Sequence, residues 1–196
     1  MSRIKKGLSK KQQILNAAFD TICEYTISGT NLREIARRVG MSQGNLHYYY
    51  PAKEELLLDL LSLLLDNFID ERKKIIYDST KKPFEKLALI LNHDNMHIQK
   101  RKEMGVFLEF CIIGAKNAII QKKFQETYNT WLSIIELFID EGIKEGSFSS
   151  KHRDFIPDLF ISIIDGAALR YHVNGKAFNL KTYFASVHTL ISELLT

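Results

Sequence analysis

The short segment 42–50 concentrates polar side chains whose types suit contacts with a nucleic acid. Gln43 and Asn45 carry amide groups that can pair with an adenine edge through two hydrogen bonds, and either can bind a phosphate instead. His47 follows two positions later and can donate or accept a hydrogen bond. Three consecutive tyrosines then supply phenol groups, although such a run can also pack the core of a small domain. The segment therefore predicts base or phosphate contacts rather than bond-making chemistry.

The rest of the sequence offers no pattern of catalytic residues. It lacks the H-E-x-x-H zinc motif, the Glu-x-x-His pair of a di-iron bundle, the G-x-S-x-G elbow, the G-x-G-x-x-G fingerprint and the phosphate-binding P-loop. His93 and His97 stand four residues apart and could share one helix face, but no further metal ligand stands at a readable spacing. We therefore predict surface histidines, no metal, no cofactor and no enzymatic activity.

Two short predicted helices hold the polar segment in place. Thr30 offers an N-cap for the first helix, Gly40 suits the left-handed turn that ends it, and Ser42 offers an N-cap for the second. Pro51 ends the second helix near Tyr49. This spacing is that of a helix-turn-helix, whose two helices cross over a small shared core. The apolar residues expected in that core are Leu32, Ile35, Ala36, Val39 and Leu46.

A core of this kind leaves the polar face of residues 43–49 free to enter the major groove, which admits one α-helix. Gly44 removes a side chain near the front of that helix, so that the backbone can approach a phosphate closely. The exposed helix N-terminus adds N–H donors that favour phosphate. A helix-turn-helix can also mediate protein contacts, which is the alternative to DNA binding.

Helical periodicity predicts an all-α chain of about nine helices, with no internal repeat and no convincing strand. Ser9 and Gln12 form an S-x-x-Q capping box before a first helix that ends near Gly29. The basic run Lys100–Lys102 is expected at a solvated corner. Beyond the helix-turn-helix, we expect helices over 53–77, 84–99, 103–114, 118–145, 154–173 and 179–195. We divide the chain into a DNA-binding domain over 1–53 and a larger helical domain over 54–196.

Charge separates these two regions. The first 53 residues hold nine Lys and Arg against three Asp and Glu, a net charge of +6, and since the whole chain carries +4 the remainder carries −2. A basic N-terminal region followed by a mildly acidic remainder suits a polyanionic partner, although unevenly placed surface lysines would give the same net charges. The hydrophobic share of 45% excludes wholesale disorder.

The two cysteines, Cys23 and Cys111, are too few for a disulfide framework, and both fall in apolar helical stretches. We expect them to pack as small hydrophobes in a reducing compartment. The most apolar stretch, Leu56–Ile69, is interrupted by Asp59 and Asp66 and is too short to span a bilayer. No apolar core of a signal peptide follows the basic opening. We therefore expect a cytoplasmic, nucleoid-associated protein with no membrane partner.

The stretch TNLREIARRVGMSQGNLHYYYPAKEELL, residues 30–57, resembles the DNA-binding signature of the TetR/AcrR family of bacterial transcriptional regulators. The likeness covers about residues 9–60 and rests on many positions at fixed spacing. Farther along, the chain fits the family in length and helical content, with a weaker likeness in EGIKEGSF (141–148) followed by Asp165 and Gly166. The shared positions are Thr30, Ile35, Ala36, Val39, Gly40, Ser42, Gly44, Leu46, Tyr48, Tyr49, Tyr50, Lys53, Glu54, Glu55 and Leu56.

The resemblance implies a role for each matched position. Thr30, Lys53 and the phenol of Tyr49 would contact phosphates, whereas Leu46 and Tyr50 would belong to the core. The full set expected at the DNA is Thr30, Arg33, Ser42, Gln43, Gly44, Asn45, His47, Tyr48, Tyr49 and Lys53.

Other positions qualify the likeness. Arg37 or Arg38 would add a contact to the DNA backbone beside Arg33. Ala52 stands where the family often has a serine that caps the next helix. Tyr48 stands where a histidine is common, so the base preference of relatives does not transfer to this chain.

The resemblance also implies a small-molecule pocket among the middle helices. Aromatic walls suit an apolar or aromatic effector, although aromatics at helical spacing can equally be core. Glu109 and Asp165 lie in otherwise apolar helices, so either could face a polar or cationic group of a ligand. The candidate pocket residues are Phe68, Phe107, Phe110, Tyr128, Trp131, Phe160, Asp165 and Tyr171.

The last two predicted helices carry apolar stripes that suit a four-helix interface between two copies of the chain. Small residues at 166–168 would allow close approach, and packing within one subunit is the alternative. The candidate interface residues are Leu159, Phe160, Ile163, Ile164, Ala167, Val187, Leu190, Ile191 and Leu194.

These features predict a homodimeric repressor that binds a palindromic operator in double-stranded DNA and is released by a small apolar or aromatic effector. Two recognition helices would enter successive major grooves about 34 Å apart. The same architecture could activate transcription. A protein-interaction adaptor that has lost DNA binding is the competing class, against which Gln43, Asn45, Tyr49 and Lys53 argue as intact DNA contacts.

Overall fold

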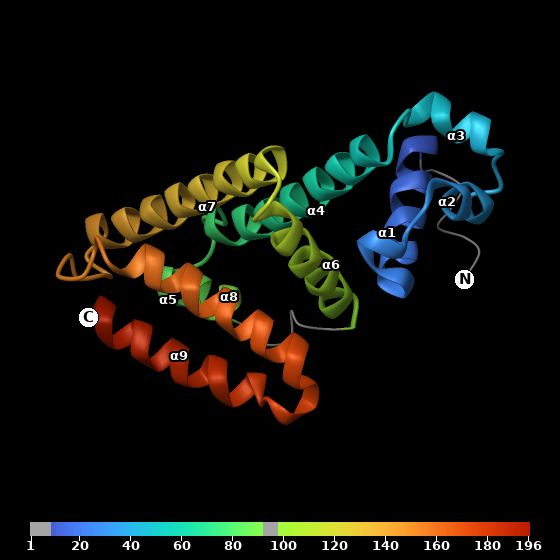
Figure 1. Cartoon of the computed structure of the whole chain (residues 1–196). Coiled ribbons are helices and arrows are strands. Elements are labelled where there is room, and N and C mark those ends of the chain that lie inside the picture. The colour runs from blue at the N-terminus through green and yellow to red at the C-terminus, as the bar shows by residue number, and fades with distance from the viewer. Residues whose placement is uncertain (1–8, 92–97) are drawn as a thin grey trace. The chain divides into compact units, whose positions relative to one another are not determined.

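The computed structural model describes residues 9–91 and 98–196, which form helices joined by short turns (Figure 1). Nine α-helices lie in these residues, which confirms the predicted all-α class and the number of helices. A short 3-10 helix, η3 (Gly175–Ala177), joins the last two. The α-helices are α1 Lys10–Gly29, α2 Leu32–Arg38, α3 Gln43–Tyr49, α4 Lys53–Ile76, α5 Pro83–Ile90, α6 Ile98–Gly114, α7 Ala118–Lys144, α8 Ile156–Asn174 and α9 Leu180–Leu195.

The chain forms two compact units. Among the described residues, unit 1 comprises 9–65 and 105–121, and unit 2 comprises 66–91, 98–104 and 122–196. Helices α4, α6 and α7 contribute residues to both units, because each of them passes through a unit boundary. The domain boundary that we place after residue 53 stays a sequence-based proposal.

Side-chain caps fix the starts of the first three helices. The Ser9 and Ser42 hydroxyls each accept a hydrogen bond at 3.2 Å, from the backbone N–H of Gln12 and Asn45 respectively, as predicted. The predicted cap of α2 was wrong by one residue, because Asn31 rather than Thr30 accepts from Glu34 N–H, at 2.9 Å. The side chain one position later is the one that reaches this amide, since α2 begins at Leu32.

The turn between α2 and α3 depends on Gly40. Its φ is +65°, in the left-handed region that a residue with a Cβ rarely adopts. The chain then reverses through a hydrogen bond of 2.9 Å from Met41 N–H to the Ala36 carbonyl. The helix-turn-helix is thereby confirmed in this part of the chain.

The prediction for residues 84–102 was wrong in two respects. Helix α5 ends at Ile90 instead of near residue 99, and the run Lys100–Lys102 lies within α6 instead of at a corner. Lysine and arginine are good helix formers, so a basic run does not by itself end a helix. His93 and His97 lie outside the described residues.

The core of unit 1 is built where α1, α2 and α3 meet. Ile35, Ala36 and Leu46 are buried as predicted, whereas Leu32 and Val39 are half-buried at the edge. The burial predicted for Tyr50 is confirmed, whereas that predicted for Cys23 is wrong. Tyr50 is buried as predicted, and its phenol donates to Asp59 at 3.1 Å, but Cys23 is exposed on α1 and does not pack as a core hydrophobe.

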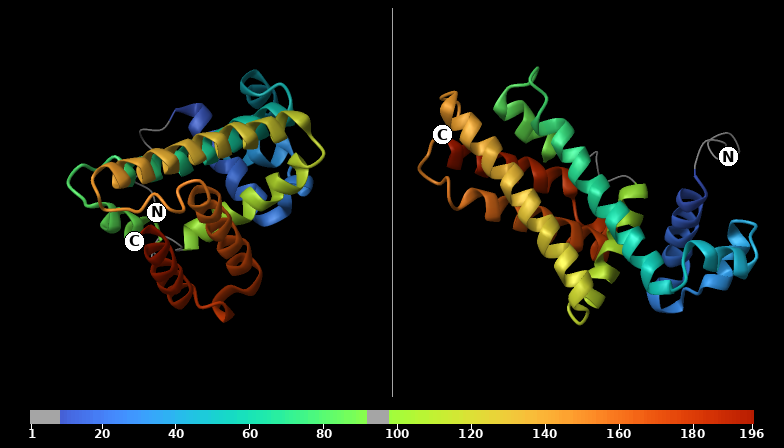
Figure 2. Two further views of the ribbon diagram at one scale, coloured as in Figure 1. Left: turned by 90° about the vertical axis from the view of Figure 1, so that its left-hand side faces the viewer. Right: turned by 90° about the horizontal axis from the view of Figure 1, so that it is seen from above.

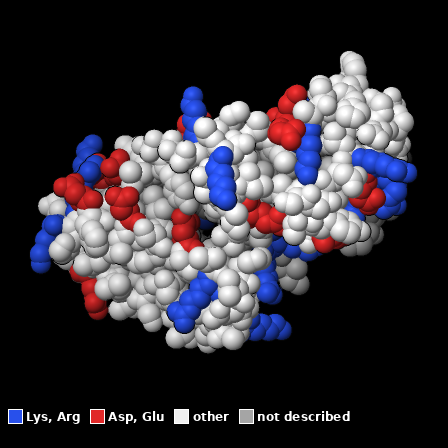
Figure 3. Space-filling model, viewed as in Figure 1, with Lys and Arg blue, Asp and Glu red and all other residues white. Residues whose placement is uncertain are grey.

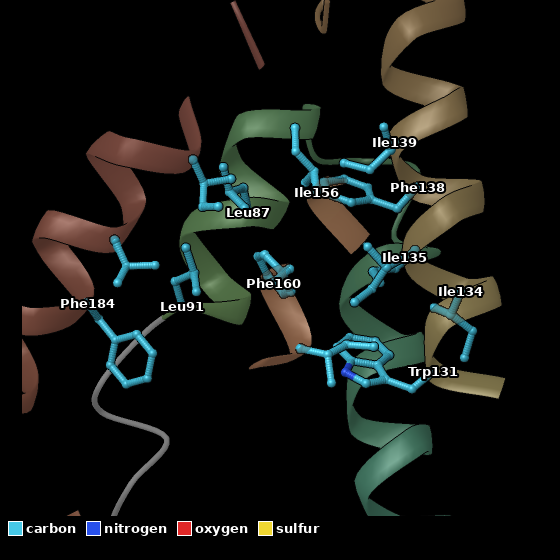
Figure 4. Packing of buried hydrophobic residues seen from close by; sticks show 14 of the residues in the cluster. Leu87, Leu91, Trp131, Ile134, Ile135, Phe138, Ile139, Ile156, Phe160 and Phe184 are labelled. Atoms are coloured by element: carbon cyan, nitrogen blue, oxygen red, sulfur yellow. The ribbon is translucent and has the colours of Figure 1, made fainter. Parts of the chain in front are cut away.

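The core of unit 2 gathers aliphatic and aromatic residues from α5, α7, α8 and α9. Helices α8 and α9 lie side by side and run in opposite directions, and the Tyr183 phenol of α9 donates to the Ile163 carbonyl of α8 at 3.4 Å (Figures 1 and 2). Figure 4 shows the centre of this packing, with residues of α7 facing those of α5 and α8. The central residues are Leu87, Leu91, Trp131, Ile135, Phe138, Ile139, Ile156, Phe160 and Phe184.

Two kinds of feature are missing from the described residues. None of their helices combines the length and the apolar character that crossing a membrane requires. Residues 9–91 and 98–196 also hold no group of three or more His, Cys, Asp or Glu side chains arranged to bind a metal ion.

Candidate functional site

One side of α3 presents only uncharged groups, and we call it the α3 face. Tyr48 is 85% exposed, whereas the neighbouring Tyr49 is half-buried. Their rings meet edge-to-face, with centroids 5.5 Å apart. Leu46, on the opposite side, is fully buried and anchors the helix to the core of unit 1. The exposed members of the α3 face are Gln43, Gly44, Asn45, His47 and Tyr48.

Hydrogen bonds order part of the α3 face. His47 Nδ1 lies 3.2 Å from the Pro51 carbonyl, which can only accept, so Nδ1 carries the proton. His47 Nε2 is then an acceptor, and it lies 3.4 Å from Gln43 Nε2. This arrangement orients the Gln43 amide and leaves its carbonyl oxygen available to a donor from outside.

Gly44 is exposed and helical, and the fold does not require a glycine there. A Cβ built at this position meets no atom within 4 Å, and the residue has no positive φ. Glycine inside a helix costs roughly 0.5–1 kcal/mol relative to alanine. A glycine that packing does not require fits the predicted close approach of a partner's backbone.

The arginines of α2 lie in a network of ion pairs. Arg37 pairs with Glu34 at 2.7 Å, and Arg38 pairs with both Glu34 at 2.9 Å and Glu24 at 2.5 Å. Hydrogen bonds from Arg37 and then Arg38 lower the pKa of Glu34 to about 2, so this carboxyl is ionised at neutral pH. Arg33 is exposed and forms no ion pair with any residue that the structure describes.

In the space-filling view, blue atoms gather over α2, while the neighbouring surface of α3 is white (Figure 3). Residues 43–49 contain no Lys, Arg, Asp or Glu. The predicted interface therefore combines a neutral face on α3 with positive charge on α2, of which Arg33 is the arginine free of described ion pairs.

Two predicted phosphate contacts point into the protein. The Lys53 ammonium donates to the backbone carbonyls of Ile27 at 2.7 Å and Thr30 at 2.5 Å. Thr30 is buried, and its hydroxyl donates to the Thr26 carbonyl at 2.7 Å. Lys53 thus secures the end of α1, and one of its three N–H donors remains for a partner. The Thr30 hydroxyl is already used within the protein.

The end of α1 is also tied to α6, which sequence reasoning missed. Glu109, one of the two carboxylates that could face a ligand, accepts a hydrogen bond of 2.6 Å from Ile27 N–H, so one of its oxygens is used within the protein. Thr26 next to it has a φ of +66° and a ψ of 168°, and such backbone strain costs of order 1–3 kcal/mol. No sequence pattern foretells a carboxylate bound to a backbone amide 82 positions away.

The predicted pocket residues are divided between the two units. Phe107 and Phe110 belong to unit 1, while the others belong to unit 2, where Phe160 lies in the core and Tyr171 is half-buried. In unit 2, the Tyr128 phenol donates to Asp165 at 2.7 Å. The set that we call the Arg72 cluster is Phe68, Arg72, Tyr128, Trp131 and Asp165.

Arg72 is the member of this cluster that sequence reasoning missed. Its guanidinium carbon lies 3.4 Å from the centroid of the Phe68 ring and 5.3 Å from that of Trp131. Burial lowers the pKa of Arg72 to about 10, and Asp165 is one of the carboxylates that oppose this shift. The available signal was an arginine four residues after Phe68 in a leucine-rich helix, since that spacing puts both on one helix face.

Several predicted interface residues lie inside unit 2. Phe160 and Ala167 are buried in its core, as are Val187 and Ile191, which corrects their prediction as surface for a second copy. Residues partly packed against this core are Leu159, Ile163, Ile164 and Leu194. The large apolar residues exposed on α8 and α9 are Leu169, Val173 and Leu190.

Comparisons with known proteins agree with this architecture. Residues 14–60 match the family described as "Bacterial regulatory proteins, tetR family", and residues 62–193 match "YsiA-like protein, C-terminal region". The chain belongs to the TetR family. It is therefore assigned to the DNA-binding transcriptional regulators, with the helix-turn-helix of α2 and α3 as the DNA-binding element.

Individual relatives resemble the chain over nearly its whole length. The Fatty acid metabolism regulator protein of Bacillus subtilis (strain 168) is 24% identical over 189 residues, 96% of either chain. A TetR transcription regulator from Haloarcula marismortui has a TM-score of 0.83 at 23% identity, covering 95% of this chain and 98% of its own. FadR from Bacillus subtilis in complex with stearoyl-CoA has a TM-score of 0.70 at 21% identity, covering 95% and 100%. The two structures share the TetR fold with this chain.

Proposed function

We propose that this TetR-family regulator is a homodimeric repressor that binds a palindromic operator and is released from it by a small effector. The observation that carries the proposal is the α3 face, whose exposed amide, imidazole and phenol groups stand on a helix anchored by buried Leu46. Neutral donors and acceptors read base edges, and the arginines of α2 supply attraction to phosphates.

The small size of the α3 face supports the proposed dimer. A single seven-residue helix reads few bases, so two copies about 34 Å apart would be needed for a long operator. Leu169, Val173 and Leu190 supply exposed apolar surface on α8 and α9. Leu190 was already a predicted interface residue, and Leu169 and Val173 take the place of the buried residues in the proposed interface.

The effector is proposed to be apolar or aromatic in part and to bind unit 2. The ring of buried Trp131 meets that of half-buried Phe68 edge-to-face, with centroids 5.9 Å apart, and we propose that the apolar part of the effector packs beside these rings. The stearoyl-CoA in the FadR structure carries a long apolar chain, which supports the same class of effector here. Release from DNA requires only that the effector binds the DNA-free state more tightly.

The test of DNA binding is fluorescence anisotropy of the full chain on DNA from upstream of its own gene, against a scrambled duplex, over a salt series. We expect tighter binding to the upstream DNA and a steep loss of affinity with salt. The double variant Gln43→Ala, Asn45→Ala should lose this selectivity, while Gln125→Ala, which removes an exposed amide on α7, should keep it. Equal binding of both duplexes, confirmed by selection from a random DNA pool, would contradict the proposal.

The dimer is tested by sedimentation. Leu190→Glu places a charge on the exposed surface of α9 and should yield monomers, while Leu137→Glu on exposed α7 should leave the mass unchanged. A parent chain that sediments as a monomer at all concentrations would refute the dimer.

A further inference from the structure

We propose that Arg72 is the receptor for an anionic head group, a carboxylate or a phosphate, on an effector with an apolar body. The inference rests on the proposed effector binding in unit 2, and it names the chemical class of that effector. It also assigns a binding role to a residue that no sequence pattern had singled out.

The hydrogen bonds of Arg72 are incomplete. Its Nη1 donates to the backbone carbonyl of Phe68 at 3.0 Å, but its Nε is buried and has no partner. No described residue accepts a hydrogen bond from Nη2 or forms an ion pair with the guanidinium. The Nε and Nη2 groups form one edge of the guanidinium, and this edge matches the two oxygens of a carboxylate or phosphate.

A buried cation without a bound anion is costly. An orphaned polar group in the interior loses the hydrogen bonds that it makes to water, and a charged group loses more. The pKa of Arg72 stays near 10, so the guanidinium remains charged at neutral pH. An anion at the Nε–Nη2 edge would supply the missing acceptors and place a negative charge in direct contact with the guanidinium.

The surroundings of Arg72 disfavour a cationic ligand. The guanidinium itself already lies over the Phe68 ring, which is where a ligand cation would bind to an aromatic face. Two carboxylates act on Arg72 by their charge: Glu71, its neighbour in α4, and Asp165, which accepts a hydrogen bond from the Tyr128 phenol at 2.7 Å. A ligand ammonium group would therefore meet a positive charge and an occupied aromatic face.

The experiment uses Trp131, the single tryptophan, whose ring lies 5.3 Å from the Arg72 guanidinium carbon, as a fluorescent reporter in the full chain. Decanoate, decyl phosphate, decan-1-ol and decylamine are titrated as probes with one apolar body and different head groups. We expect at least one of the two anions to bind tighter than decan-1-ol by about tenfold or more, as charge-assisted hydrogen bonds outweigh neutral ones. The stronger of the two anions identifies a carboxylate or a phosphate as the natural head group.

Variants assign the preference to Arg72. Arg72→Met keeps an unbranched apolar stem and removes the guanidinium, and it should reduce the ratio of anion affinity to alcohol affinity to about one while decan-1-ol still binds. Arg170→Gln is the matched control, because Arg170 also stacks on an aromatic ring, that of Phe178 at 4.4 Å, and should keep the ratio. Arg72→Lys retains the charge but cannot form two parallel hydrogen bonds to one anion, and it should give an intermediate ratio. This variant also tests the role of Arg72 if Arg72→Met fails to fold.

Several results would overturn the inference. For the parent chain, they are equal affinity for the anions and decan-1-ol, tighter binding of decylamine than of either anion, or no binding of any probe. For a folded Arg72→Met variant, it is an unchanged ratio of anion affinity to alcohol affinity. Operator binding is measured by anisotropy on the same samples. Selective DNA binding without anion preference would refute the role of Arg72 and leave the proposed repressor intact, so the two failures are distinguishable.

Discussion

The α3 face in unit 1 and the Arg72 cluster in unit 2 use charge in opposite ways. On α2, beside the α3 face, exposed Arg37 and half-buried Arg38 are both paired with glutamates, and α3 itself carries no Lys, Arg, Asp or Glu. In unit 2, the Arg72 Nε is buried with no acceptor. Under our two proposals, the difference corresponds to two modes of recognition: a solvated face that docks on DNA, and a buried group whose hydrogen bonds are completed by an anionic ligand.

The largest expected effect concerns the anchor of the α3 face. Leu46→Ala removes a fully buried side chain from the core of unit 1 and should cost about 2–5 kcal/mol of unfolding free energy. Calorimetry should show a lower transition for unit 1, with DNA binding lost and probe binding at Trp131 retained. Leu46→Met, which conserves volume, is the control and should lose less than about 1.5 kcal/mol. Equal loss of DNA binding and of probe binding in Leu46→Ala would show that the two regions are not energetically separate.

Lys53 connects stability with DNA binding. Lys53→Ala leaves the carbonyls of Ile27 and Thr30 without a donor and should cost about 1–3 kcal/mol of stability. DNA affinity should also fall alike on all sequences, since a phosphate contact carries no base preference. An unchanged Tm would argue against the two carbonyl contacts, and a sequence-selective loss of affinity against the phosphate contact.

Gln43 is expected to read a base. Gln43→Ala should change the preference at one symmetric pair of operator positions, by about 1–3 kcal/mol at each. Selection from a random DNA pool, compared between mutant and parent, measures this change. Identical base preferences of mutant and parent would indicate that the Gln43 amide, which His47 orients, contacts the DNA backbone instead of a base.

Gly44 should separate stability from function. Because the position is helical and has open space for a Cβ, Gly44→Ala should stabilise the chain by roughly 0.5–1 kcal/mol. It should also weaken operator binding, since the added methyl group blocks close approach of the DNA backbone. A more stable variant with full affinity would show that Gly44 has no role at the interface.

The smallest effects are pH dependences of opposite sign in the two regions. Glu34 has its pKa lowered to about 2, so it stabilises unit 1 above its ordinary pKa of 4.5 and loses this contribution as the pH falls toward 2. Burial raises the pKa of Asp165, so this carboxyl favours the folded state at low pH and opposes it as the pH rises above 3.8. Glu34→Gln should therefore lower the Tm more at pH 6 than at pH 2.5, and Asp165→Asn should show the reverse trend.

Local signals made most of unit 1 predictable. Ser9, Gly40 and Ser42 act within a few residues of themselves, and a cap or a left-handed turn is a property of the local backbone. Thr30 shows the limit, since Asn31 next to it has a side chain of the same capping type. A choice between two adjacent caps depends on which side chain packs inward, and Thr30 does.

Contacts between distant residues could not be predicted. The bond from Ile27 N–H to Glu109 and those from Lys53 to the end of α1 join segments whose meeting depends on tertiary packing. Arg72 was not predicted because it lies in the charged run Asp70–Lys74, and long basic side chains most often extend their charge to the surface. The aromatic residues were recognisable as a group, but their division between the core and a binding site depends on which of them meet a polar partner, as Tyr128 does at Asp165.

The absence of charged residues from α3 has a consequence for how such a regulator changes its targets over time. Non-specific attraction to the chromosome depends on basic groups elsewhere, such as Arg33, and it sets how long the protein slides and hops along DNA between targets. Exchanging Gln43, Asn45 or Tyr48 for other uncharged residues would alter the preferred operator and leave that search almost unaffected. Search speed and target choice can therefore diverge independently among descendants of one ancestral gene.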